Sequence, residues 1–159
     1  MNAKTLISLA VLPVAVLCMA ALPSIASTPE PEGLEAVRRY ALDVWTQGKL
    51  DVLNEITTSD VERDAAVPGA DASGRDALIE VVRVTRTALP DLHITIGKAE
   101  EAHGGLFVSW HAKGSYTGTG FGPTTGKSFS TNGTSFFRIE DGRIAFEFAG
   151  YDFVDQYKQ

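Results

Sequence analysis

The chain has 159 residues, a formal net charge of −6 at pH 7 and a single cysteine. An acidic protein does not attract nucleic acid or an anionic membrane surface through its overall charge, so we expect neither as a partner. One cysteine cannot form an internal disulfide.

Residues 1–26 are predicted to be a signal peptide. One positive charge precedes the uncharged apolar run of residues 5–22, and Ser24 and Ala26 give the small-x-small cleavage pattern. The alternative is an uncleaved N-terminal membrane anchor, because this 18-residue run is nearly long enough to span a bilayer. Pro13 and the small residues favour cleavage near Ala26. We therefore predict an exported protein, periplasmic or secreted, that has no other contact with the membrane.

Residues 27–32 read STPEPE, which predicts a polar linker. Residues 33–159 then form one domain, large enough for a single core. Because Cys18 lies in the predicted leader, the mature domain has no cysteine. It can hold no disulfide, no thiolate nucleophile and no cysteine-bound metal.

The first half of the domain predicts three helices. Apolar residues recur at steps of three and four from Leu34, and Gly48 stands where this helix would end. Residues 49–56 predict a second, short helix. A third helix follows Ser73, which is a candidate cap, and ends before Pro90.

The second half predicts a sheet, because the apolar period changes from 3.6 to 2 after the third helix. Between the second and third helices, residues 57–72 predict a loop or an edge strand. The strand candidates are residues 92–100, 106–118, 128–140 and 143–153, separated by turn compositions such as EAHGG and DG. Helices followed by an antiparallel meander predict the α+β class, with the helices on one face of a curved sheet.

The segment of residues 120–128, GFGPTTGKS, is close to the phosphate-binding pattern GxxxxGK[ST]. That pattern requires a glycine where Phe121 stands, and a helix after its final serine. The residues that follow, FSTNGTSFF, predict a strand instead. We therefore interpret the segment as a hairpin that connects two strands, with glycines for its turns.

Four short motifs occur in order along the domain. They are WTQGKLDVL at the end of the first helix, Gly74 with Pro90-Asp91 around the third, GSYTGTGFGPTTGK, and DGRI followed by Asp152. In this order and spacing they resemble the SnoaL-like polyketide cyclase (ester cyclase) family of the NTF2-like superfamily, over residues 34–156. The resemblance implies a cone in which a curved antiparallel sheet of about four to six strands wraps on three N-terminal helices. It also implies a homodimer formed through the outer sheet face.

The resemblance further implies an intramolecular aldol closure in which a carboxylate acts as acid and base. Asp152 matches the family's C-terminal aspartate and is the candidate catalytic residue, expected in a dry apolar pocket. Alternatively, Asp152 only closes a strand or caps the C-terminal tail. Tyr116, Glu147 and Arg63 stand where the family carries histidines. A dehydratase or ketosteroid isomerase type of activity is a third option, and dehydratase chemistry of that sort uses a His–Asp pair. The nearest histidine, His111, is predicted to point away from the side of its strand that carries Trp110 and Tyr116, so this option is ranked last.

The candidate ligand-binding residues are Trp45, Trp110, Tyr116, Phe121, Asn132 and Phe148. Trp110 and Tyr116 share one strand face, where they form either a flat wall for a ligand or part of the core. Asn132 is an unusual residue for a central strand. It either bonds a ligand oxygen or, with Gly133, marks a bulge.

Glu147 alternates with Phe146 and Phe148, so it is predicted to face solvent or a partner if these phenylalanines line the pocket. The predicted dimer contacts are Phe107 and Phe137. The histidines are not spaced as metal ligands, so neither a metal nor another cofactor is predicted. Two functions remain. One is a cyclase or isomerase acting on a small hydrophobic carbonyl compound, and the other is a non-catalytic module for ligand binding or dimerisation.

Overall fold

The structure is a computed structural model that describes residues 30–66, 69–119 and 124–152. The predicted signal peptide, the first half of the predicted linker (residues 27–29) and Phe121 therefore lie outside the described residues. Among the residues described, no helix is long and apolar enough to cross a membrane.

The three predicted helical segments are present. The helical elements are α1 (Leu34–Arg39), η1 (Tyr40–Thr46), η2 (Leu50–Val52), α2 (Leu53–Ile56) and α3 (Arg75–Ala88). The first helix, formed by α1 and η1, is followed by Gly48, whose φ of +73° suits a glycine. The predicted cap of α3 is wrong: Ser73 belongs to a strand, and the N-cap residue is Gly74, with no side-chain hydrogen bond at the cap.

Six strands form one sheet in the order β2-β1-β6-β5-β4-β3. They are β1 (Thr57–Ala65), β2 (Ala72–Ser73), β3 (His93–Ala102), β4 (Gly105–Ser115), β5 (Ser128–Glu140) and β6 (Arg143–Tyr151). The α+β class is confirmed, but the sheet is mixed rather than antiparallel, because β1 pairs with β6 in parallel. This pairing joins strands from opposite ends of the domain.

Two tight turns fix the meander. Asp141 and Gly142 connect β5 to β6 with φ values of 49° and 73°. His103 and Gly104 connect β3 to β4 with φ values of 53° and 74°. Two consecutive residues of positive φ are typical of the two-residue hairpin turns that match the twist of a sheet. The DG and HG pairs therefore set the register of the meander.

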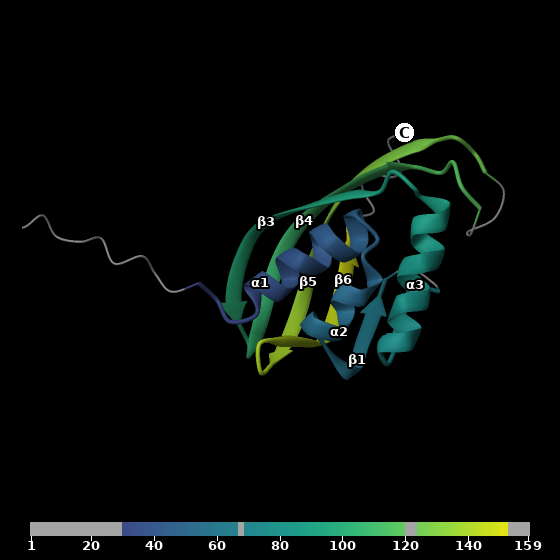
Figure 1. The fold of residues 1–159 in the computed structure, drawn as a ribbon. Helices are drawn as coiled ribbons and strands as arrows, with labels where there is room; N and C mark the ends of the chain where they lie inside the picture. The colour runs from purple at the N-terminus through teal and green to yellow at the C-terminus, as the bar shows by residue number, and fades with distance from the viewer. Residues whose placement is uncertain (1–29, 67–68, 120–123, 153–159) are drawn as a thin grey trace, which may run out of the picture.

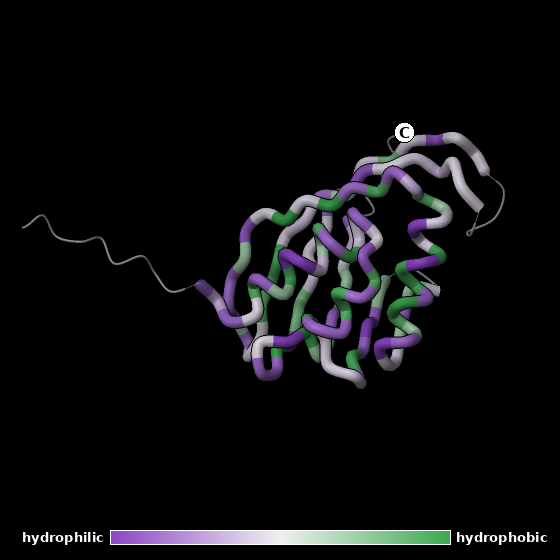
Figure 2. The backbone as a smooth tube through the Cα atoms, in the orientation of Figure 1, coloured by the Kyte–Doolittle hydropathy of each residue, from purple (hydrophilic) through white to green (hydrophobic). Residues whose placement is uncertain are grey.

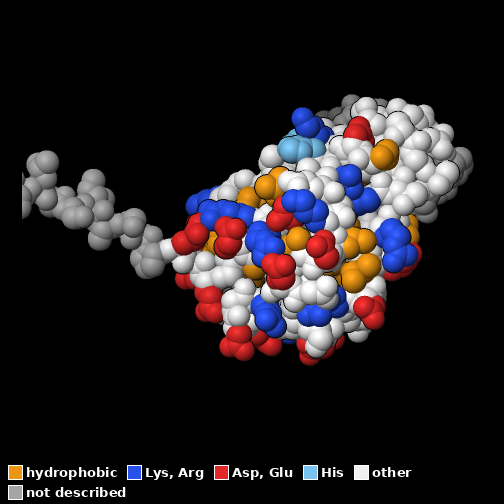
Figure 3. Space-filling model, viewed as in Figure 1, with side chains coloured by type: hydrophobic (Ala, Val, Ile, Leu, Met, Phe, Trp, Pro, Cys, Tyr) orange, Lys and Arg blue, Asp and Glu red, His pale blue; other side chains and the backbone are white. Residues whose placement is uncertain are grey.

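The helices α1 and α2 lie across the inner face of the curved sheet, and α3 lies beside β1 (Figure 1). Apolar residues recur on the helices and along the strands (Figure 2). The core between the two layers includes Val44, Leu53, Val82, Leu106 and Ile144, each at most 1% exposed. On the side that carries the helices, acidic and basic side chains are interspersed around small apolar areas (Figure 3).

Alternation along β5 separates the two faces of the sheet. Thr131, Ser135 and Phe137 are buried on the inner face, and Asn132 is exposed on the outer face. Phe137 was predicted to be a dimer contact on the outer face. The orientation assigned to its side chain is wrong, because Phe137 is 3% exposed and packs inside the protein against Tyr40.

Candidate functional site

A carboxylate is enclosed between the sheet and the first helix. Glu147 of β6 is 5% exposed, and its inward-facing neighbours Ala145 and Ala149 are 4% and 2% exposed. Phe148, on the opposite face, is 42% exposed. The predicted orientation of Glu147 toward solvent or a partner is therefore wrong. The alternation of β6 was interpreted correctly, but the two sets of alternating residues were assigned to the wrong faces of the sheet.

Arg63 forms an ion pair with Glu147. The two residues are register partners on the parallel strands β1 and β6, and the Arg63 Nε atom lies 2.9 Å from the Glu147 Oε2 atom. The guanidinium also donates to the Tyr151 hydroxyl at 3.2 Å and to the Ala70 carbonyl. It lies over the Trp45 ring, 5.3 Å from the centroid, within the range of a cation–π contact. Both charges of the pair are thus buried and paired.

Two hydroxyl groups complete the surroundings of the carboxylate. The Tyr40 hydroxyl donates to Glu147 Oε2 at 2.9 Å, and the Ser135 hydroxyl donates to Oε1 at 3.0 Å. The Trp110 Nε1–H in turn donates to Ser135 Oγ at 3.0 Å. Because that oxygen accepts from Trp110, the serine hydrogen is directed at the carboxylate. Each carboxylate oxygen therefore has at least one donor.

The electrostatics keep Tyr40 neutral and Arg63 charged. Burial raises the pKa of Tyr40 well above its usual value, and the negative charge of Glu147 raises it further. Burial alone would lower the pKa of Arg63, but the negative charge of Glu147, together with the interactions with Tyr40 and Tyr151, outweighs this effect and raises the pKa above its usual range. Tyr40 is thus a permanent hydrogen-bond donor, and Arg63 a permanent cation.

These groups form the polar end of a cavity of about 320 Å³. Its remaining wall is mainly apolar and includes Val37, Leu89, Ile94, Val108, Ala112 and Phe129. A mostly apolar cavity with a few convergent polar groups is the usual form of a small-molecule site, and this volume is at the lower end of the range for such sites. The arrangement suits a small apolar molecule with one polar group.

Three predicted ligand-binding residues line this cavity. Trp45 is 7% exposed and its ring lies beneath the Arg63 guanidinium. Trp110 packs edge-on against Tyr151, with ring centroids 5.1 Å apart. Tyr116 is 37% exposed and contacts Phe129, with ring centroids 5.5 Å apart. Trp45 and Trp110 therefore contribute to the interior wall, and Tyr116 contributes at the solvent-facing side.

Asp152 does not lie in an apolar enclosure, contrary to the expectation from the sequence. It is exposed just beyond the end of β6, where its amide donates to the Asn132 carbonyl at 2.8 Å. Its own carbonyl accepts a hydrogen bond from Thr131 Oγ1 at 3.2 Å. Because Asp152 and Glu147 are an odd number of residues apart, a regular strand directs them to opposite faces.

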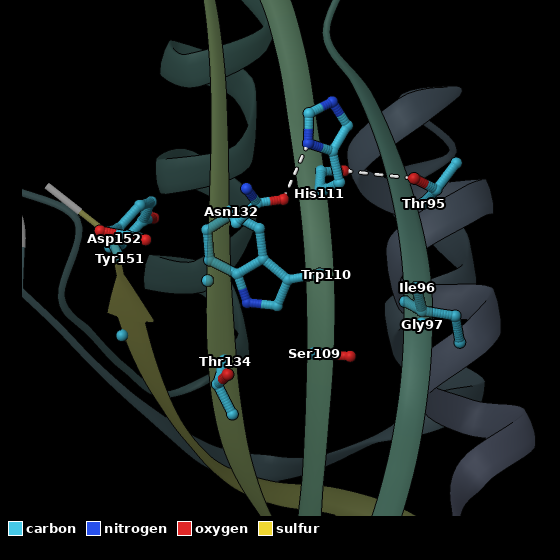
Figure 4. A pocket seen from close by; sticks show the side chains of 12 residues that line it. Thr95, Ile96, Gly97, Ser109, Trp110, His111, Asn132, Thr134, Tyr151 and Asp152 are labelled. Atoms are coloured by element: carbon cyan, nitrogen blue, oxygen red, sulfur yellow. Dashed lines mark hydrogen bonds between the residues drawn. The ribbon is translucent and has the colours of Figure 1, made fainter. Parts of the chain in front are cut away.

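Asn132 and Phe148 lie on the outer face of the sheet. Asn132 pairs with His111 in regular register, and its Oδ1 atom is 3.0 Å from His111 Nδ1. It therefore neither reaches the interior nor marks a bulge. Asn132, His111 and Asp152 line a shallow depression of about 750 Å³ on this face (Figure 4). In the described part of the chain, no three His, Cys, Asp or Glu side chains form a possible metal site.

The family described as SnoaL-like polyketide cyclase matches residues 35–159. The fold is similar to that of a proposed SnoaL-like polyketide cyclase from Jannaschia sp. CCS1, with a TM-score of 0.71, 18% identity, and 83% of this chain and 95% of that one covered. It is also similar to IdmH, a proposed polyketide cyclase from Streptomyces antibioticus, with a TM-score of 0.64, 19% identity, and 80% and 97% covered.

A third similar structure is a protein from Catenulispora acidiphila with a ketosteroid isomerase-like fold, solved with trimethylamine. Its TM-score is 0.65 at 20% identity, with 76% of this chain and 88% of that chain covered. At these identities the likenesses establish the ketosteroid isomerase-like, or NTF2-like, fold. No curated protein matches the chain.

Proposed function

This chain belongs to the SnoaL-like polyketide cyclase family, and we propose that its interior cavity binds a small hydrophobic carbonyl compound. One observation carries the proposal. The buried Arg63–Glu147 pair, with the hydroxyls of Tyr40 and Tyr151, lies at one end of a cavity whose other walls are mainly apolar. A ligand with an apolar body and one acceptor oxygen matches both ends.

In this proposal the Arg63 guanidinium donates hydrogen bonds to the carbonyl oxygen of the ligand. A guanidinium carries five N–H donors. Among the described residues, three of these donors have acceptors, on Glu147, Ala70 and Tyr151. The remaining two can bond a ligand oxygen, while the apolar body of the ligand lies against Trp110 and the aliphatic wall. Neither interaction requires Glu147 to leave Arg63.

The experiment that tests binding uses the fluorescent ketone 6-propionyl-2-dimethylaminonaphthalene. In an apolar cavity its emission should shift to the blue and saturate at one ligand per chain, with a Kd on the order of micromolar. A change that increases linearly with protein concentration, without saturation, would reject the proposal.

A second candidate function, enolisation of the bound compound, is favoured by the position of the Glu147 carboxylate beside Arg63 in the same cavity. Glu147 would take the proton on the carbon next to the carbonyl. The electron pair of the C–H bond would move toward the oxygen, where Arg63 stabilises the negative charge, and Glu147 would then return the proton. This assigns proton transfer to the enclosed carboxylate rather than to Asp152.

Deuterium uptake by 2-tetralone in D₂O, followed by NMR, tests this chemistry without knowledge of the natural substrate. The wild type is expected to exchange the acidic C–H faster than buffer, and Glu147→Gln is expected to reduce exchange to the buffer rate. Asp152→Asn, which changes an exposed carboxyl, should keep the wild-type rate. If the wild type binds the ketone but exchanges its C–H at the buffer rate, as both variants then also would, enolisation is rejected and the protein binds the ketone without catalysis.

A homodimer through the outer sheet face is proposed as well. On that face the ring centroids of Phe107 and Phe136 are 4.9 Å apart, and those of Phe136 and Phe146 are 6.4 Å apart. Phe148, the register partner of Phe136, is 42% exposed beside them. An aromatic surface of this kind is stabilised by a partner. Light scattering should give a dimer for the wild type and a monomer for Phe148→Asp. A monomeric wild type would contradict the proposal.

A further inference from the structure

Arg63 gives the cavity a permanent positive charge, which by itself would attract carboxylates. Guanidinium groups bind carboxylates strongly through charge-assisted hydrogen bonds, especially where water is excluded. Here the anion position beside Arg63 is already occupied by a side chain of the same protein, since Glu147 Oε2 lies 2.9 Å from Arg63 Nε. The pair as a whole is electrically neutral.

The surroundings of Glu147 form a complete carboxylate cradle. In the described part of the chain its donors are three and come from three separate elements: Tyr40 from η1, Arg63 from β1 and Ser135 from β5. Trp110 fixes the serine hydroxyl through its own hydrogen bond at 3.0 Å. A cradle assembled from elements far apart in sequence is held by the fold rather than by Glu147 alone. Its donors match any carboxylate of suitable size.

We infer that Glu147 is a specificity-determining residue: it is a built-in counter-ion that makes the cavity accept neutral carbonyl compounds and exclude carboxylates. A carboxylate ligand would place a second negative charge next to Glu147 where water is scarce, and like charges repel strongly there. A neutral carbonyl oxygen accepts hydrogen bonds from Arg63 without this penalty. The inference rests on the proposed function, because it names the charge class of the ligand in the same cavity.

Two near-isosteric probes test the selection directly: the neutral 2-acetylnaphthalene and the anionic 2-naphthoate. By calorimetry, the wild type is expected to bind the ketone at least tenfold more tightly than the acid. Glu147→Gln keeps the size of the side chain and removes its charge, so it is expected to bind the acid more tightly than the wild type does, at least tenfold. Equal binding of both probes by the wild type would overturn the inference.

Chemical rescue tests the cradle independently of any ketone. Glu147→Ala removes the carboxylate but leaves the donors of Tyr40, Arg63 and Ser135 around an empty space. Sodium formate is expected to raise the melting temperature of this variant by several degrees relative to sodium chloride at equal concentration, because a ligand that binds the native state stabilises it. The wild type, whose cradle is filled, should not respond.

The double variant Arg63→Met/Glu147→Ala is the matched control, because it keeps the space and loses the cation. It is expected to show no response to formate. A formate response equal in the wild type and in this control would show that formate acts elsewhere, and would overturn the inference. If the wild type binds neither naphthalene probe, the proposed function fails, whereas the formate response still decides whether the cradle accepts a carboxylate. Glu147→Gln keeps the test decisive if Glu147→Ala does not fold.

Discussion

Arg63→Met is expected to lower the free energy of unfolding by about 3–5 kcal/mol, the usual cost of leaving one partner of a buried ion pair without its counter-charge. Arg63 and Glu147 are each 5% exposed, so little solvent reaches the carboxylate to take the place of the lost guanidinium. Among the described residues, the carboxylate would keep only the hydroxyl donors of Tyr40 and Ser135. Urea denaturation of the wild type and the variant measures the difference.

Two controls separate the charge from the loss of packing. Replacing both partners, as Arg63→Met/Glu147→Met, is expected to recover most of the lost stability, because an apolar pair needs no counter-charge. Arg83→Met breaks the exposed pair between Arg83 and Glu80, whose side chains are 58% and 55% exposed. This change should cost at most about 1 kcal/mol. A double variant as unstable as Arg63→Met would contradict the interpretation.

Ala112→Phe is expected to weaken binding of the fluorescent ketone by about two orders of magnitude, or about 2.7 kcal/mol. Ala112 lies on the inner face of β4, is 5% exposed and lines the cavity. A phenyl ring at this position would occupy space that the ligand needs. The cost in stability is expected to be about 1–3 kcal/mol, typical of added volume in a packed interior. The ketone titration gives the affinity, and urea denaturation shows that the variant is folded.

The matched control is the neighbouring residue on the same strand. His111 points to the outer face, where it is hydrogen-bonded to Asn132 (Figure 4). His111→Phe adds a ring to the other side of β4 and should bind the ketone as the wild type does. If His111→Phe loses binding and Ala112→Phe retains it, the ketone binds in the outer depression and not in the cavity.

The local part of the fold could be predicted from the sequence. The change of apolar period after α3 predicts where the antiparallel meander of β3 to β6 begins, and the DG pair predicts the turn at Asp141. The bounds of β5 match the prediction at both ends. The parallel pairing of β1 with β6 is different in kind: it joins residues about 85 positions apart, and alternation within each strand says nothing about which strands become neighbours.

The inward orientation of Glu147 was missed because β6 is apolar on both faces. Phe146 and Phe148 suggested the interior, whereas they belong to an aromatic outer surface, so hydrophobicity did not define the phase of the strand. A usable signal was present in Ala145 and Ala149, on either side of Glu147. Small residues two positions before and two positions after Glu147 fit the crowded inner side of a curved sheet. Arg63 could not be paired with Glu147 without the β1–β6 contact.

A crystal structure of the complex with 2-acetylnaphthalene tests most directly whether the Arg63–Glu147 pair receives the ligand. The account predicts the naphthalene ring inside the cavity against Trp110, with the ketone oxygen about 3 Å from a guanidinium nitrogen of Arg63 and with the Arg63–Glu147 contact intact. A ketone bound beside Asp152 on the outer face, with the cavity empty, would contradict it.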